Sequence, residues 1–201
     1  MASIESVILE APDPAAAGAL HAALGVDGHV SARPSDADST GFRGFTLSLV
    51  VSQPSTVDSL IGTALECGAT TLKPAAKSFW GYGGVVQAPD GAIWKVATSN
   101  KKDTGPATRQ IDDIALLLGV ADVKASKQFY VDHGLAVAKS FGSKYVEFES
   151  QGSLVKLALY GRKALSKDAG VPVDGSGSHR VVIGSAAGPF TDPDGFVWEA
   201  V

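Results

Sequence analysis

The chain carries the same turn-and-strand pattern twice, and this repeat constrains its fold more than any other feature. The segment "APDGAIWKVA" at residues 88–97 is matched by "DPDGFVWEAV" at residues 192–201, and the two Asp-Gly dipeptides lie 104 positions apart. Pro-Asp-Gly supplies the fixed φ, the side-chain-capped turn and the positive φ that a tight reversal needs. Each segment therefore predicts a hairpin turn that leads into a strand containing Trp.

Strand and helix patterns around these turns predict a repeated β-α-β-β-β unit. In residues 44–99, a β-branched apolar run is followed by a helix with Pro54 near its start and Gly68 near its end, and then by three strand-like runs. The same order of elements returns in residues 110–161. We therefore predict an α+β protein in which two complete units form curved mixed sheets.

The two ends of the chain predict shortened units. The number of residues between matching segments of the two halves rises from 107 to 136 along the chain and then falls to 104. Each half therefore lacks roughly 30 residues that the other keeps. Residues 1–43 and 175–201 are the remnants, and the polar segment 100–109 is a linker. The chain thus divides into an N-terminal half, 1–99, and a C-terminal half, 110–201.

The composition and charge of the chain argue against some classes of binding partner. The 201 residues are 45% hydrophobic and carry a formal net charge of −4, with no Lys/Arg block that could follow a phosphate backbone, so we expect no nucleic acid partner. The single cysteine, Cys67, excludes an internal disulfide and suits a reducing compartment. No apolar run approaches the roughly 20 residues of a membrane span. We expect a cytoplasmic protein that does not bind membranes.

Three segments occur together and in order within this pattern: "KPAAKSFWGYGGVVQAPDGAIWKVA", "SKQFYVDHGLAV" and "FTDPDGFVWEA". They resemble the vicinal oxygen chelate superfamily, which includes glyoxalase I, bleomycin-resistance proteins and extradiol dioxygenases. The resemblance covers nearly the whole chain. It implies an eight-stranded, incompletely closed barrel or U-shaped sheet made from paired units, with a ligand cleft inside the curve.

The resemblance also implies where a divalent ion would lie. Active members of the superfamily hold it with His, Glu or Gln on the first and last strands of the units. The matching positions here are Ser6, about Thr46, Asp113 and about Val182 on first strands, and Lys95 and Glu199 after the Trp residues. An ammonium group repels a divalent ion, and two carboxylates fall short of the usual three or more protein ligands. We expect no metal, with Asp113 and Glu199 as the fallback ligands and His179 or Glu147 as a third.

An aromatic and basic segment is the candidate for ligand binding. The side chains expected at the mouth of the cleft are Lys73, Lys77, Phe79, Trp80 and Tyr82, joined by Phe42 and Arg43. Aromatic faces stack on a planar ligand, and cations neutralise an acidic one. The alternative is that these side chains pack the sheet or lie in solvent. Four other aromatic residues are expected in the core: Trp94, Phe129, Tyr130 and Trp198.

Three functions follow from these features. The favoured one is metal-free binding or sequestration of a small aromatic or acidic molecule, as the resemblance to bleomycin-resistance proteins implies. The second is a lyase, isomerase or dioxygenase that uses Zn, Ni, Mn or Fe at Asp113 and Glu199. The third is a non-catalytic assembly protein. A homodimer stays open, because incomplete units of this superfamily commonly pair across subunits.

Overall fold

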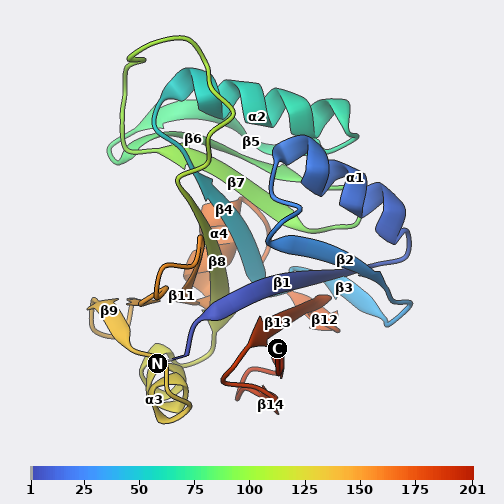
Figure 1. Ribbon diagram of the computed structural model, residues 1–201, viewed down its shortest axis with the longest axis vertical. Coiled ribbons are helices and arrows are strands. Elements are labelled where there is room, and N and C mark those ends of the chain that lie inside the picture. Colours follow the sequence, from blue (N-terminus) through green and yellow to red (C-terminus); the bar gives the residue numbers. More distant parts are fainter. Residues whose placement is uncertain (1) are drawn as a thin grey trace.

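The computed structural model, which describes residues 2–201, has a large eight-stranded sheet, a small five-stranded sheet and a two-stranded pair, with helices packed on the sheets (Figure 1). The strands of the large sheet are β4 (Phe45–Val50), β5 (Thr70–Ser78), β6 (Gly81–Gln87), β7 (Ile93–Thr98), β8 (Asp113–Val120), β9 (Val137–Ser140), β10 (Tyr145–Phe148) and β11 (Val155–Gly161). Their order is β5-β6-β7-β4-β8-β11-β10-β9.

The large sheet is assembled from the two predicted β-α-β-β-β units, which meet at its centre. β4 and β8 pair antiparallel from Phe45↔Leu118 to Val50↔Asp113, whereas β4 pairs with β7, and β8 with β11, in parallel. The central strands are rich in buried Leu and Ile. This arrangement confirms the α+β class with mixed sheets and the pairing of both complete units in one sheet.

Helices α1 (Pro14–Leu24), α2 (Pro54–Glu66) and α3 (Val123–Asp132) pack on the sheets much as the sequence predicts. The Asp13 side chain caps α1 by accepting a hydrogen bond from the Ala16 amide, and Gly25 ends the helix in the left-handed conformation. Trp94, Tyr130 and Trp198 are at most 1% exposed, which confirms their expected place in the core.

The remnants form a second sheet of their own. Its strands are β1 (Ile4–Ala11), β2 (Val30–Pro34), β13 (Val181–Ser185), β14 (Phe190–Thr191) and β15 (Val197–Glu199), in the order β14-β15-β13-β1-β2. The remnants therefore do not extend the edges of the large sheet. The reason is that β1 and β13 pair antiparallel with each other, from Ile4↔Ser185 to Leu9↔Val181. Between the sheets, β3 (Ser39–Gly41) pairs with β12 (Gly175–Gly177).

One helix has no counterpart in the predicted units. Helix α4 (Arg162–Ala169) follows β11 and packs against β8, β11 and β4 (Figure 1). Leu165 and Ala169, one helical turn apart, are buried in a small apolar cluster with Phe42, Val85 and Ile93. α4 therefore covers part of the sheet face opposite to the one that bears Trp94 and α2.

Residues 100–109 contain no helix or strand, but they are attached to α2. The Gln53 side chain accepts hydrogen bonds from the amides of Thr104 and Gly105, and donates one to the Pro106 carbonyl at 2.6 Å. The segment is thus held in place along its length. Among the described helices, none has the length and apolar character needed to cross a membrane.

Candidate ligand site on the inner face of the large sheet

The inner face of the large sheet is the one that bears Lys95, Ser48, Ala115 and Lys156. These four residues form a row of direct partners on neighbouring strands. Lys95 on β7 pairs with Ser48 on β4, Ser48 pairs with Ala115 on β8, and Ala115 pairs with Lys156 on β11. Directly paired residues in a sheet point to the same side. A row of two small side chains flanked by two lysines therefore crosses the middle of the inner face.

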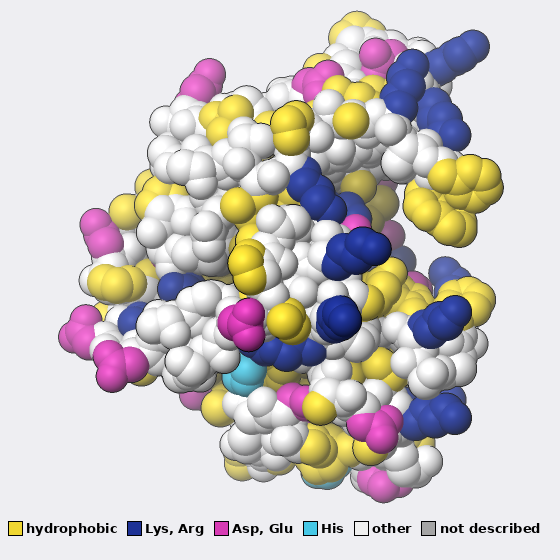
Figure 2. Space-filling model, turned by 180° about the vertical axis from the view of Figure 1, so that it is seen from behind, with side chains coloured by type: hydrophobic (Ala, Val, Ile, Leu, Met, Phe, Trp, Pro, Cys, Tyr) yellow, Lys and Arg dark blue, Asp and Glu magenta, His cyan; other side chains and the backbone are white. Residues whose placement is uncertain are grey.

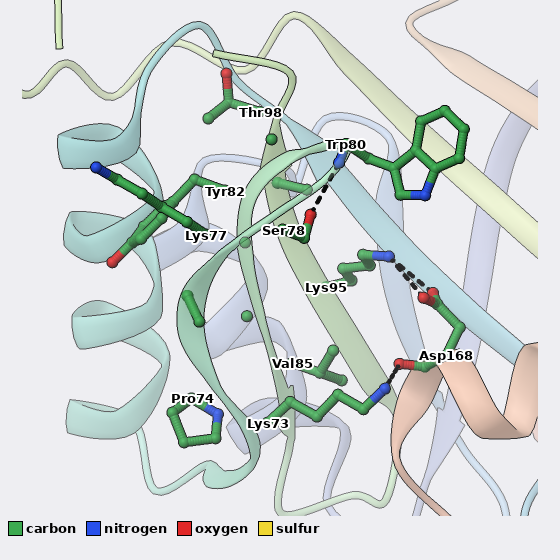
Figure 3. A pocket seen from close by; sticks show the side chains of 15 residues that line it. Lys73, Pro74, Lys77, Ser78, Trp80, Tyr82, Val85, Lys95, Thr98 and Asp168 are labelled. Carbon is green, nitrogen blue, oxygen red and sulfur yellow. Dashed lines mark hydrogen bonds and ion pairs between the residues drawn. The ribbon is translucent and has the colours of Figure 1, made fainter. Parts of the chain in front are cut away.

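A pocket of about 330 Å³ lies over β5, β6 and β7 beside α4. In it, Lys95 Nζ lies 3.0 and 2.8 Å from the two carboxylate oxygens of Asp168, and Lys73 Nζ donates to the carbonyls of Lys167 and Asp168 at 2.7 Å each (Figure 3). Two ammonium groups from different strands thus converge on the C-terminal turn of α4. Because that end of a helix carries a partial negative charge, α4 acts as an internal anion for both lysines.

A second pocket, of about 220 Å³, lies over β4, β8, β10 and β11. Here Lys156 Nζ lies 2.9 Å from Asp113 Oδ2, and the Tyr145 hydroxyl donates to Glu147 Oε2 at 2.8 Å. Lys139 Nζ lies 3.5 Å from Glu147 Oε1. Burial, and then the hydrogen bond to Glu147, raise the pKa of Tyr145 well above its ordinary value. This phenol therefore stays protonated and can donate a hydrogen bond.

The two pockets together are positively charged although the chain as a whole is acidic. The charged residues that line them are the cations Lys73, Lys77, Lys95, Lys139 and Lys156 and the carboxylates Asp113, Glu147 and Asp168. Figure 2 shows Lys and Arg side chains gathered around the hollowed part of the surface on this side of the molecule. An anion gains more here than at an average position on a protein with net charge −4.

Exposed aromatic side chains stand at the tips of two hairpins of the large sheet. Phe79 and Trp80, between β5 and β6, are 83% and 82% exposed and meet edge to face with ring centroids 4.9 Å apart. Phe141, between β9 and β10, is 64% exposed. Trp80 lines the pocket that contains Lys95, and Figure 3 shows its indole on the same side of β6 as Lys95. These rings can cover a planar ligand bound on the inner face.

Two of the side chains expected at the mouth of the cleft point away from it. Lys77 and Tyr82 are partners on β5 and β6, on the face opposite to Lys95, and lie beside α2 in Figure 3. The Tyr82 hydroxyl donates to Asp58 of α2 at 2.8 Å, and this bond raises the pKa of Tyr82. Lys73, Phe79 and Trp80 remain as candidates.

Phe42 and Arg43 are also placed differently from the expectation. Phe42 is 3% exposed in the cluster beneath α4, and the Arg162 guanidinium lies 5.1 Å from its ring centre. Arg43 lies against the first Pro-Asp-Gly turn, at Gly91, and burial lowers the pKa of its guanidinium. Phe42 is therefore a core residue, and Arg43 supports the turn.

Comparison with solved structures places this arrangement among known folds. Glyoxalase I from Zea mays aligns over 100% of this chain and 92% of its own, with a TM-score of 0.61 and 14% sequence identity. The chain has the fold of glyoxalase I. A Bacillus subtilis protein named as a candidate dioxygenase aligns over 90% of this chain and 69% of its own, with a TM-score of 0.55 and 12% identity. No protein-family model and no curated protein matches the sequence.

The metal positions of the glyoxalase fold do not carry a fitting donor set in this chain. Asp113 lies in the large sheet, paired with Lys156, whereas Glu199 lies in the small sheet, where Arg33 bridges it to Glu10 at 2.8 Å each. The two fallback ligands therefore lie in different sheets, each paired with a cation. Within residues 2–201, no three His, Cys, Asp or Glu side chains are grouped as metal ligands.

His179 does not supply a third ligand. Its Nδ1 lies 2.5 Å from the Arg43 carbonyl oxygen, its Nε2 lies 2.9 Å from the Asp194 carbonyl oxygen, and its ring stacks on Phe196. Both ring nitrogens are thus engaged by the protein itself. Sequence reasoning missed Asp168 and Lys156 as members of the candidate site. The short amphipathic pattern of residues 162–169 before Gly170 was the available signal for Asp168.

Proposed function

We propose that this protein binds a small planar anion on the inner face of the large sheet, without a divalent metal. The observation that carries the proposal is the convergence of Lys73 and Lys95 on α4 beside the exposed ring of Trp80. The carboxylate of Asp168 occupies the position that a ligand carboxylate would take. Sequestration of such a ligand requires a cleft but no reacting group.

The charge arrangement supports binding over metal chemistry. In the complete unit at residues 44–99, the residue that follows the Trp is Lys95. Its ammonium group already pairs with Asp168. A cation at the centre of the site neutralises an acidic ligand and needs no metal to do so. Aromatic side chains at the rim supply a stacking surface for the planar part of such a ligand.

Calorimetric titration with naphthalene-2-carboxylate tests the proposal. We expect the wild-type protein to bind this probe and the Lys95→Met variant to bind it at least about tenfold more weakly, because one charge-assisted contact is lost. Asp168→Asn should tighten binding, because the internal competitor loses its charge. This change should not destabilise α4, because a carboxylate near the C-terminus of a helix is unfavourable.

The matched control is Lys124→Met, which removes an exposed lysine on α3 that lies outside both pockets. Its affinity for the probe should equal that of the wild type. Failure of the wild-type protein to bind the probe, or equal weakening by the Lys95 and Lys124 changes, contradicts the proposed function. Stoichiometric Zn, Ni, Mn or Fe in protein purified without chelator contradicts its metal-free part.

A further inference from the structure

The inner face carries a second lysine that mirrors Lys95 across the middle of the sheet. Lys95 on β7 and Lys156 on β11 are the outer members of the row in which Ser48 and Ala115 are the inner ones. Three strand spacings separate the two lysines, which is roughly 14 Å at the Cα atoms for about 4.8 Å per spacing. Each ammonium is paired with one carboxylate, Asp168 or Asp113.

The floor between the two lysines is made of small side chains. Ser48 is 7% exposed, and Ala115 lines the pocket of Lys156. In the next row along the strands, Ala97 pairs with Val50 and Val50 with Asp113. Ala97 lines the pocket of Lys95, and Val50 lines the pocket of Lys156. The two pockets are therefore neighbours along one shallow trough with a small-residue floor and a cation on each side.

We propose that the ligand carries two acidic groups, and that the trough holds one at Lys95 and the other at Lys156. This inference rests on the proposed function and narrows its ligand to a planar dianion. Asp168 and Asp113 mark the two positions that the acidic groups take. Binding exchanges the two internal ion pairs for two pairs to the ligand, and the partly exposed carboxylates of Asp168 and Asp113 turn toward solvent. The aromatic tips at Trp80 and Phe141 lie on the corresponding hairpins of the two units and cover the two ends of the ligand body.

The test compares naphthalene-2,6-dicarboxylate with naphthalene-2-carboxylate, which has the same rings and one acidic group fewer. By calorimetry, we expect the wild-type protein to bind the dicarboxylate at least about tenfold more tightly than the monocarboxylate. Lys156→Met should remove this preference, because it should weaken dicarboxylate binding far more than monocarboxylate binding. Lys156→Arg, which keeps the charge, should retain most of the preference, and Lys95→Met should weaken the binding of both probes.

The outcomes separate the two proposals. Binding of the monocarboxylate with no preference for the dicarboxylate overturns the dianion inference and leaves the proposed function standing. A preference that survives Lys156→Met also overturns the inference. If neither probe binds, the proposed function itself is contradicted. Thermal unfolding of each variant shows that it is folded, and Lys124→Met again serves as the charge-matched control.

Discussion

Tyr130 and Asp192 form a buried polar pair beside a cluster of aromatic side chains. Tyr130 is fully buried among Phe148, Phe190 and Trp198, and its hydroxyl donates to Asp192 Oδ2 at 2.5 Å. Asp192 Oδ1 accepts from the amides of Asp194 and Phe196, which builds the second Pro-Asp-Gly turn. One carboxylate thus connects α3 to the end of the chain, and its protonation state affects the stability of both.

The pH dependence of stability tests this pair. Burial raises the pKa of Asp192 above its ordinary value of 3.8, although the hydrogen bond from Tyr130 acts in the opposite direction. The stabilisation from this group is therefore full below about pH 3.8 and is lost as the pH rises through the raised pKa. We expect the difference in unfolding free energy, wild type minus Asp192→Asn, to fall between pH 3 and pH 7. Urea unfolding measures it, and a flat or rising difference contradicts the assignment.

His179 joins the two sheets at a single side chain. It contacts the Arg43 carbonyl before β4 and the Asp194 carbonyl in the second turn, and neither carbonyl gains an equivalent partner if the ring is removed. We expect His179→Ala to lower the unfolding free energy by about 1–3 kcal/mol. His29→Ala, at a turn where the structure shows no side-chain hydrogen bond, should change it by less than about 0.5 kcal/mol. Equal effects of the two changes in urea unfolding would rule out this role.

Among the elements, α4 has the greatest effect on the site, because it fills part of the inner face and presents Asp168 to the lysines. The largest buried side chain of α4 is Leu165, which is 1% exposed and packs in one apolar cluster with Ala169. We expect Leu165→Ala to cost about 2–5 kcal/mol of unfolding free energy, as for other buried Leu residues. The control Leu65→Ala removes a Leu that is 41% exposed on α2 and should cost far less. A Leu165 effect no larger than the Leu65 effect would show that α4 is not packed as described.

Local signals predicted the elements that depend on local interactions. The N-cap Asp13, the end at Gly25 and the Pro-Asp-Gly turn before Trp94 were all readable, because each acts over a few residues. The positions of Lys73 and Lys77 were not readable in this way. The ladder between β5 and β6 is irregular between Lys73 and Ala76, so two lysines four residues apart point to opposite faces. No count along the sequence could place both correctly.

At the scale of the whole molecule, the two halves of the sequence are interlocked. The N-terminal half supplies β1 to the small sheet and β4 to the large one, and the C-terminal half supplies their partners β13 and β8. A single apolar core contains side chains from both sheets, among them Val7, Leu47, Leu116 and Ile183. Residues 100–109 connect the halves in the chain, but they do not divide the structure into two independent bodies.

Separate production of the halves tests this interlocking. We expect residues 1–99 and residues 110–201, each alone, to lack a cooperative urea transition, because each exposes an apolar strand edge and half of a core. Mixing the two fragments should restore the far-ultraviolet circular dichroism of the intact chain. A cooperative transition in either isolated fragment would contradict the shared core. The sequence repeat alone could not reveal this, because similar units can pair within or across halves.

The pairing of β1 with β13 also fixes an order of events during synthesis. β1 is translated first, yet its partner begins at Val181, near the end of the chain. At about 5–20 residues per second, roughly 10–35 s pass between the two strands. The large sheet is complete once residue 161 has emerged, so it can close while one edge of β1 still has no neighbour. The nascent chain therefore carries an unpaired β-edge until residues Val181–Ser185 have emerged from the ribosome.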